Sequence, residues 1–394
     1  MRVNSDKNIL ILTTVSGFLC KFEIENVKIL QQLGYVVHYA TNMKEQHYHF
    51  DEKELKRLNV RVHHIDIARS PYMLRANAKA LAQLTEIVEQ QNIQAVHSHA
   101  PVGGVLARLL GKRFKERNLK VIYTAHGFHF YKGAPLINNT IYYHVEKHLA
   151  KGTDVLLVIN EEDYQSVQKF RLRKGGILRK ISGVGLDMEK FHPFSEAKRK
   201  EQRKKLGIGE TDIFALSVGE LNANKNQGTI LKALAKRRQR DADAQCIKYG
   251  ICGDGFLKEH IHSEIKRLQL EDVVTMFQYC TNIPEILGCA DFLIFPSQRE
   301  GLGMAGVEAL AMQIPVLASN NRGTREYMQH MQNGYVCEYN DIEGFIKGMD
   351  YLATLTKEQR SAMQSSATES VKRFDKMLVR SEMKAVYQKL DEML

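Results

Sequence analysis

Short apolar runs alternate with amphipathic stretches through most of the chain. Apolar runs of about four to eight residues predict buried strands, and apolar residues spaced three or four apart predict helices. In the first half, the predicted strands are 8–14, 35–40, 60–67, 95–98, 119–124 and 154–159. The predicted helices are 22–33, 71–91, 102–117, 136–151 and 161–171. This alternation is typical of a parallel sheet covered by helices on both faces.

The rhythm breaks between residues 181 and 205, where glycines, a proline and a charge run predict an interdomain link. It then restarts. The later strands are predicted at 213–218, 246–252, 273–277, 291–295 and 316–318, and the later helices at 229–240, 257–268, 283–287 and 304–312, with a helical tail from 341 onward.

This pattern predicts an α/β protein with two doubly wound, Rossmann-like domains facing across a cleft. We expect an N-terminal domain at 1–182 and a C-terminal domain at 183–375, both of the nucleotide-binding type. A C-terminal helix at 376–394 is expected to pack back toward the N-terminal domain. Ligands of such sheets bind beyond the carboxyl ends of the strands, so those loops are the place to look for chemistry.

Length and composition narrow the class of protein. The 394 residues exceed what one ordinary core holds. The six cysteines form no Cys-x-x-Cys pair and no His/Cys cluster in the sequence, which argues against a zinc site or a disulfide framework. We see no signal peptide and no apolar run near the roughly 20 residues needed to cross a bilayer. We expect a cytoplasmic protein that is soluble or peripheral to the membrane.

The positive charge is confined to the first half of the chain. Residues 1–180 carry 27 Lys and Arg against 16 Asp and Glu, whereas residues 181–394 carry 29 of each. A single basic cluster is usually a solvated face, but the one-sided total favours a polyanionic partner such as anionic lipid headgroups. Nucleic acid is disfavoured because no recognition helix, zinc finger or ladder of stacking aromatics accompanies the basic residues.

Polar residues and glycines follow several predicted strands at the sheet end where ligands bind. Each has a structural alternative, since glycines serve turns and lone histidines are often satisfied core groups. Their joint placement at one end of two sheets favours function. In the first domain they are Gly17, His97, His99, His126 and His129, and in the second Gly219, Lys225, Gly253, Gly255, Glu300, Gly301 and Gly303.

The stretch 295–311, FPSQREGLGMAGVEALA, places two carboxylates beside a predicted helix start. The free amide groups of that helix start, near Gly303, Met304 and Ala305, suit a phosphate. Glu300 precedes this point and Glu308 follows it by about one helical turn. The two carboxylates can therefore reach groups on either side of a bound phosphate. Because carboxylates and phosphate are both negatively charged, this position suits the carboxylates only if they bind hydroxyl groups.

Several motifs carry a family resemblance that covers nearly the whole chain. The run PSQREGLGMAGVEALAMQIPVLAS resembles the E-x7-E segment of glycosyltransferase family 4, whose members have the GT-B fold. VGELNANK, GVGLDMEKF and ICGDGFLKEHI are similar to that family's phosphate-lysine loop, interdomain motif and G-x-G turn. VHSHAPVGGVLARL, VIYTAHGFHFYKGAP and TDVLLVINEEDY resemble the bacterial branch that builds capsular or exopolysaccharide repeat units.

The resemblance implies that the domain at 1–182, with His97, His99, His126 and His129, is the acceptor side and that the domain at 183–375 binds the nucleotide sugar. It also implies a role for each matching residue. Glu300 would hold hydroxyls of the donor sugar, and Glu308 would accept hydrogen bonds from the ribose. Lys225 would neutralise the diphosphate, with the amides near Gly303–Ala305 as a second anchor and Gly17 leaving room on the N-domain side. His126 would orient the transferred sugar or the acceptor. The family transfers with retention of configuration, usually without a metal, so no metal or cofactor is expected.

The sequence departs from the family in the phosphate loop, where Glu220 stands in place of a common arginine. Arg299, Arg322 and Arg325 are the candidates for a replacement cation. The first loop has Gly17 but no glycine pair. Asp241–Asp243 spells the D-x-D of metal-dependent glycosyltransferases, but it lies at the wrong end of the predicted sheet, and we interpret it as a surface turn.

The resulting hypothesis is a membrane-peripheral, retaining hexosyltransferase. It moves a sugar from a nucleotide diphosphate donor, expected to be a UDP-sugar, to a polyprenyl diphosphate-linked saccharide. The basic first domain would then face the anionic membrane. Two alternatives are a non-hydrolysing nucleotide-sugar epimerase of the same fold, and a non-enzymatic basic scaffold that binds membrane or nucleic acid.

Overall fold

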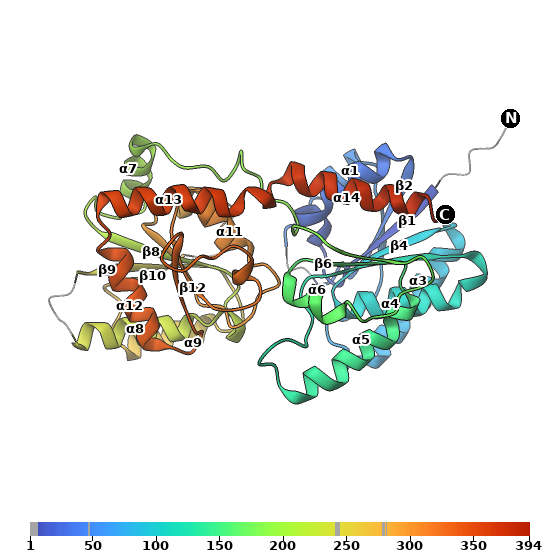
Figure 1. Cartoon of the computed structure of the whole chain (residues 1–394), viewed down its shortest axis with the longest axis horizontal. Helices are drawn as coiled ribbons and strands as arrows, with labels where there is room; N and C mark the ends of the chain where they lie inside the picture. The colour runs from blue at the N-terminus through green and yellow to red at the C-terminus, as the bar shows by residue number, and fades with distance from the viewer. Residues whose placement is uncertain (1–6, 46–47, 241–244, 278–279, 281) are drawn as a thin grey trace. The chain divides into compact units, whose positions relative to one another are not determined.

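The computed structural model describes residues 7–45, 48–240, 245–277, 280 and 282–394. The chain forms two compact units: unit 1 comprises Met1–Gly185 and Met377–Leu394, and unit 2 comprises Leu186–Lys376. Each unit is built on a parallel sheet with helices packed against it (Figure 1). The predicted fold class, two doubly wound Rossmann-like domains, is confirmed.

The sheet of unit 1 has the strand order β3-β2-β1-β4-β5-β6-β7, and each neighbouring pair is parallel. The order reverses between β1 and β4, which makes their carboxyl ends the topological switch point. The strands are β1 Lys7–Leu12, β2 Tyr35–Thr41, β3 Arg61–His64, β4 Ala95–His99, β5 Lys120–Ala125, β6 Val155–Val158 and β7 Ile177–Lys180.

The helices of unit 1 follow the predicted alternation, except that the short helix α2 was not predicted and one predicted long helix is divided. The segment predicted as one helix over 136–151 is instead a π turn, a short α-helix and a 3-10 turn. Thr140 explains part of this, because its hydroxyl donates to the carbonyl of Leu136 and competes with the helical backbone. The helical elements are η1 Leu19–Glu23, α1 Ile24–Gln32, α2 Glu52–Arg57, α3 Leu74–Gln90, α4 Pro101–Arg113, η2 Lys115–Arg117, η3 Asn138–Tyr142, α5 Tyr143–Leu149, η4 Ala150–Gly152, α6 Glu161–Val167 and α14 Lys376–Asp391.

The sheet of unit 2 has the order β10-β9-β8-β11-β12-β13, with its switch point between β8 and β11. Its strands are β8 Ile213–Val218, β9 Ile247–Cys252, β10 Val274–Phe277, β11 Phe292–Phe295, β12 Val316–Ser319 and β13 Gly334–Cys337. Its helical elements are α7 Glu196–Lys205, η5 Ala223–Lys225, α8 Gln227–Arg240, α9 Lys258–Arg267, α10 Ile283–Leu287, α11 Met304–Ala311, η6 Thr324–Glu326, α12 Ile342–Ala353, α13 Lys357–Val371 and η7 Lys372–Phe374.

The predicted interdomain link was wrong in its second half, because the charge run is helix α7 of unit 2. The hydroxyl of Ser195 caps this helix by accepting from the Lys198 amide. Arg203 is 2% exposed; it pairs with Asp291 at 3.2 Å and donates to the carbonyl of Cys289. A buried arginine with these partners anchors the helix to the unit, which a count of charges could not show.

The last helix, α14, packs with unit 1, although the whole of unit 2 separates it in the sequence from the rest of that unit. Its Tyr387 is buried, Arg380 pairs with Glu25, and Asp391 pairs with Lys7 at 2.6 Å. Figure 1 shows α14, in red, beside the blue elements at the start of the chain. The units divide after Gly185, three residues beyond the predicted boundary.

Among the described residues, no helix is both long enough and apolar enough to cross a bilayer.

Candidate functional site

The candidate site of unit 2 lies at the carboxyl ends of β8 and β11, which flank the switch point. A loop after β8 carries Lys225, and a loop after β11 carries Glu300. The Nζ of Lys225 lies 2.6 Å from Oε1 of Glu300, and the two side chains are 22% and 13% exposed. Residues 75 positions apart in sequence thus form one cation–carboxylate pair at the sheet end where ligands bind.

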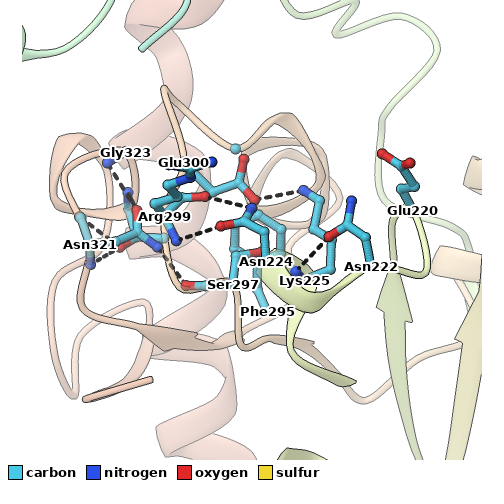
Figure 2. A network of polar contacts seen from close by, with 12 residues as sticks. Glu220, Asn222, Asn224, Lys225, Phe295, Ser297, Arg299, Glu300, Asn321 and Gly323 are labelled. Carbon is cyan, nitrogen blue, oxygen red and sulfur yellow. Dashed lines mark hydrogen bonds and ion pairs between the residues drawn. The ribbon is translucent and has the colours of Figure 1, made fainter. Parts of the chain in front are cut away.

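Asparagine side chains hold the two loops together (Figure 2). Asn222 accepts from the backbone amide of Lys225 at 3.0 Å, which ends the loop in a short 3-10 turn. The amide of Asn224 donates to the carbonyl of Arg299 at 3.0 Å and accepts from the Arg299 amide. Asn226 donates to the carbonyl of Pro296 at 3.1 Å. The position of Lys225 opposite Glu300 is therefore built into the backbone.

The glycines of the second unit pack the loops closely. A Cβ on Gly253 would lie 1.9 Å from the carbonyl oxygen of Gly219, and one on Gly255 would lie 2.5 Å from that of Leu221. Close backbone approach therefore requires glycine at 253 and 255. Their predicted donor contacts stay a prediction, since packing alone explains these residues.

Helix α11 begins beside the same pair. Gly303 adopts φ +87°, and no described side chain caps the helix. A Cβ at Gly303 would lie 2.7 Å from the ring of Phe295, so the loop from Gly301 to Gly303 is held tightly against β11. The first amides of α11, near Met304 and Ala305, are those that a helix leaves without an intrahelical partner. Glu308 lies on the second turn of α11 and is half-buried.

Of the three arginines considered as replacement cations, Arg322 contacts Glu300 through its side chain. It is 6% exposed, and its Nε donates to the carbonyl of Glu300 at 3.3 Å. Arg325 Nη1 donates to Asn320 at 3.2 Å, and Arg299 contributes its backbone to the loop contact. Glu220 lies at the edge of the network in Figure 2. Sequence reasoning missed Tyr327, whose hydroxyl donates to the carbonyl of Gly303 at 3.1 Å.

The candidate residues of unit 1 gather at the ends of β1, β4 and β5. Gly17 adopts φ +77°, and a Cβ there would lie 2.4 Å from the carbonyl oxygen of Tyr48, so only glycine fits. His97 and His99 are on β4 itself, and His126 and His129 follow β5. The structure thus places the predicted acceptor-side histidines in one region, although two of them are buried.

His97 is fully buried and satisfied within the fold. Its Nδ1 lies 2.9 Å from the hydroxyl of Tyr387 on α14, and its Nε2 lies 2.8 Å from the hydroxyl of Thr124. Burial lowers the pKa of His97 to about 3, and the nearby His126 contributes. His97 is therefore neutral near pH 7. It joins α14 to the sheet, and its assignment to the acceptor side stays a prediction.

A chain of polar groups connects the buried interior to His126. Nδ1 of His99 lies 3.0 Å from Nε2 of His126, and Nε2 of His99 lies 3.6 Å from Oε2 of Glu23. The surrounding protein lowers the pKa of His126 to about 4 and that of His99 well below its usual value. Burial raises the pKa of Glu23 to about 8. The chain thus consists of neutral groups that can donate and accept hydrogen bonds near pH 7.

Sequence reasoning missed Glu23 and Phe18. Glu23 is 2% exposed. The ring of Phe18 packs against those of His99 and His126, at centroid distances of 5.3 and 5.4 Å. The one sequence signal for Glu23 was a carboxylate on the apolar face of the predicted helix over 22–33. That signal is weak without knowledge of the neighbouring histidines.

One cluster of possible metal ligands occurs among the described residues: Glu23, His97 and His99 each offer an atom within 4.8 Å of the others. Both ring nitrogens of His97 already lie at hydrogen-bond distance from hydroxyls, so His97 would have to give up one of these contacts to bind a metal. Nε2 of His99 has no hydrogen-bond partner among the described residues. Asp241 and Asp243, the D-x-D pair, lie outside the described residues. Metal independence stays a prediction.

Two doubly wound domains, with tight glycine loops and a Lys–Glu pair at the switch point of the second, are the architecture of GT-B glycosyltransferases. Comparison with known families agrees. Residues 8–160 match the family described as "Glycosyl transferase 4-like", and residues 198–370 match "Glycosyl transferases group 1".

Curated relatives and solved structures point the same way. The chain is 35% identical over 346 residues to the "Putative glycosyltransferase EpsD" of Bacillus subtilis, covering 88% of this chain and 87% of that protein. It is 26% identical to an Escherichia coli "UDP-Gal:alpha-D-GlcNAc-diphosphoundecaprenol alpha-1,3-galactosyltransferase", covering 69% of each. HepE of Anabaena in complex with UDP-glucose has the same fold, with a TM-score of 0.74 at 16% identity over 97% of this chain and 99% of that chain. The chain therefore belongs to the group 1, family 4-like glycosyltransferases, which confirms the resemblance seen in its motifs.

Proposed function

We propose that this glycosyltransferase is a retaining, metal-independent hexosyltransferase of surface polysaccharide biosynthesis. It moves a sugar from a UDP-sugar to a saccharide linked to polyprenyl diphosphate. The observation that carries the proposal is the Lys225–Glu300 pair at the switch point of unit 2. The printed name of the Escherichia coli relative, with a UDP-sugar donor and a lipid diphosphate acceptor, supports the choice of substrates.

Binding of the donor would break the Lys225–Glu300 ion pair, and both side chains would then contact the donor. Lys225 neutralises the diphosphate, and the first amides of α11 bind its other oxygens. Glu300 accepts hydrogen bonds from hydroxyls of the sugar, and Glu308 accepts from the ribose. Arg322 supplies the second positive charge in place of the arginine that Glu220 replaces, because it already lies against the Glu300 loop.

The reaction needs no protein nucleophile. The bond between the anomeric carbon and the diphosphate oxygen breaks, and the acceptor oxygen bonds to the same face of the sugar. The acceptor's proton passes to the departing phosphate oxygen. Charge then builds up on the diphosphate, where Lys225 and the α11 amides stabilise it. Retention of configuration follows because both events use one face.

Unit 1 would present the acceptor. His126 is half-buried at the end of β5 and neutral near pH 7, so it can orient a hydroxyl without becoming charged. His129 lies on the same loop, and Gly17 would leave room for the phosphate or sugar on the N-domain side. The excess of 11 positive charges in residues 1–180 suits the diphosphate of a lipid-linked acceptor and an anionic membrane surface. We propose a peripheral location on the inner face of the cell membrane.

A transfer assay tests this function. The protein is incubated with a panel of radiolabelled nucleotide sugars and a bacterial lipid extract, with and without EDTA. We expect label from a UDP-sugar in the lipid phase, in an α linkage if the donor is α-linked, and an equal rate with EDTA. A changed sugar without acceptor would indicate the epimerase instead. Absence of turnover with every donor would favour the non-enzymatic scaffold.

A further inference from the structure

Two segments of unit 1 expose large apolar side chains to solvent. Tyr72 is 80% exposed, Leu74 is 74% exposed and Leu136 is 83% exposed. We name as the apolar surface of unit 1 the exposed side chains of Met73, Leu74, Leu136, Ile137, Ile141 and Val145 together with Tyr72. Single exposed apolar residues are normal, but several in two short segments mark an interaction site.

The two segments lie side by side. The hydroxyl of Tyr72, before α3, lies 3.1 Å from the hydroxyl of Tyr142, which ends η3. Figure 1 shows α5 and the segment leading into it, in blue-green, projecting from the rest of unit 1. The exposed residues of both segments therefore belong to one surface.

The inner face of the same helical segment is already used by the core. Tyr143 packs against Phe130 and Phe170, and Glu146 forms a buried pair with Arg108 at 2.6 Å. A helix that is apolar on both faces is expected to be covered on both. The part of the chain that the structure describes covers only the inner face. Ile137, Ile141 and Val145 recur at four-residue spacing on the outer one.

The charges on these two segments are mostly positive, although the carboxylate of Glu162 accepts a hydrogen bond from the backbone amide of Lys132. Residues 69–79 and 131–151 together contain six Lys and Arg, and their single acid, Glu146, is neutralised by Arg108 in the core. The cations are Arg69, Arg75, Lys79, Lys132, Lys147 and Lys151, all exposed, with Lys79 paired to Asp66. Apolar side chains ringed by cations match the chemistry of an anionic bilayer surface.

The apolar surface is also continuous with the candidate acceptor region. The ring of His129 stacks on that of Tyr142 at a centroid distance of 5.1 Å, and Tyr142 contacts Tyr72. The loop that carries His126 and His129 runs on through Lys132 into Leu136 and Ile137. A membrane seated on this surface would hold a lipid-linked molecule beside the acceptor-side histidines.

We propose that the apolar surface of unit 1 docks onto an anionic lipid bilayer, with Leu136, Ile137 and Ile141 entering the interface. Lys132, Lys147 and Arg75 then contact lipid phosphates. The proposal rests on the proposed function in one respect, because an acceptor anchored in the bilayer gives this docking its purpose. The net charge of residues 1–180 indicated an attraction to anionic membranes without locating it. The proposal assigns that attraction to particular side chains.

The absence of tryptophan from all 394 residues provides a direct test. The substitution Leu136→Trp places a single fluorophore on the apolar surface. Leu378→Trp places one at a 52%-exposed leucine of unit 1 outside it, as a matched control. Anionic phosphatidylglycerol vesicles should shift the emission of Leu136→Trp to the blue and allow brominated lipid to quench it. Leu378→Trp should show neither effect.

A second pair of variants measures the effect on binding. The double substitution Leu136→Ser with Ile137→Ser should weaken co-sedimentation with anionic vesicles at least tenfold, whereas Leu378→Ser should not change it. Transfer to a water-soluble acceptor analogue should be unchanged in both, which separates failure of docking from failure of the enzyme. Unshifted Leu136→Trp emission with vesicles, or wild-type binding by the double variant, would overturn the proposal. The latter result would point to a protein partner for this surface.

Discussion

The two units share a topology but place opposite kinds of chemistry at their switch points. In unit 2, two charged side chains of opposite sign pair in a partly exposed position. In unit 1, the corresponding region holds histidines whose pKa values are lowered and a buried carboxyl, Glu23, whose pKa is raised. One site is ready to exchange its ion pair for a charged ligand. The other is a neutral hydrogen-bonding surface, and the positive charge of unit 1 lies on its exterior.

The largest expected effect is on the folding of unit 1. Arg108 and Glu146 form a buried bidentate pair that fastens α5 to α4, and Arg108 also lies over the ring of Tyr123. Arg108→Met leaves Glu146 buried without its partner and should lower the free energy of unfolding by about 3–5 kcal/mol. Denaturant unfolding followed by circular dichroism measures this.

The exposed arginine of the same helix, Arg113, is the matched control, and Arg113→Met should change the unfolding free energy by less than about 0.5 kcal/mol. Affinity for a UDP-sugar, measured under conditions where the variant is folded, should be unchanged by either substitution. Loss of donor affinity in Arg108→Met would contradict the assignment of donor binding to unit 2.

The next effect concerns the carboxylate of Glu300. Glu300→Gln removes the charge but keeps the shape, and transfer should slow by about 10²- to 10³-fold, as for loss of a preorganised polar contact in a transition state. Glu259→Gln, an exposed position on α9, serves as the control and should transfer at the wild-type rate. Initial rates at saturating donor make the comparison, and equal rates in the two variants would refute the site.

Lys225→Met should act chiefly on donor binding. The substitution removes the ammonium group, which also lies over the ring of Phe295, and keeps most of the aliphatic stem. A charge-assisted contact contributes about 1.5–3 kcal/mol, so the KM for the donor should rise by roughly 10- to 150-fold. Lys232→Met on the neighbouring helix α8 is the control. If the KM moved equally in both, the lysine would have only a general electrostatic effect.

How much of this could be read from the sequence differs between the two sites. In unit 2, the sequence predicted the E-x7-E stretch, strand β11 and the start of α11. All three lie in one segment, where an apolar run is followed by glycines and then by a helix start. The contact between Lys225 and Glu300 could not be predicted from spacing. It depends on β8 and β11 being neighbours in the sheet, and on the side chain of Asn224 reaching the Arg299 backbone.

In unit 1, the sequence could not show which of the predicted site residues are buried. His97 and His99 follow an apolar run, as a catalytic loop would, yet they lie within β4 and face buried partners. The segment 136–151 was predicted as one helix, and that prediction did not indicate that Leu136, Ile137 and Ile141 are exposed. The charge run at 196–205 was predicted as part of a linker, but it forms helix α7. Its Arg203 is buried and pairs with Asp291, a contact that the sequence does not reveal.

The smallest effect is a pH dependence that separates Glu23 from the histidines. The pKa of Glu23 is about 8 in the folded protein against an ordinary 4.5, so the folded state holds a proton that the unfolded state releases between these values. Stability from this group is present at low pH and is lost as pH rises toward 8. The slope should reach about 1.4 kcal/mol per pH unit near pH 7.

The histidines act in the opposite sense and in another window. The pKa of His126 is about 4 when folded against an ordinary 6.5, so its protonation destabilises the fold as pH falls below 6.5. The groups facing Glu23 are His97, His99, Asn26 and Tyr387. The histidines contribute equally to wild type and Glu23→Gln, so the difference between the two unfolding free energies isolates Glu23. This difference should change between pH 6.5 and 8, with the wild type losing stability relative to the variant as pH rises. An unchanged slope in this variant would show that another group is responsible.

The division of labour between the carboxylates of unit 2 is tested most directly by titrating UDP and a transferred UDP-sugar into Glu300→Gln and Glu308→Gln by calorimetry. If Glu300 binds the sugar and Glu308 the ribose, Glu300→Gln weakens the UDP-sugar but leaves UDP at its wild-type affinity. Glu308→Gln weakens both ligands. Equal weakening of UDP and UDP-sugar by Glu300→Gln, or wild-type affinity for both ligands in the two variants, would contradict donor binding at this site.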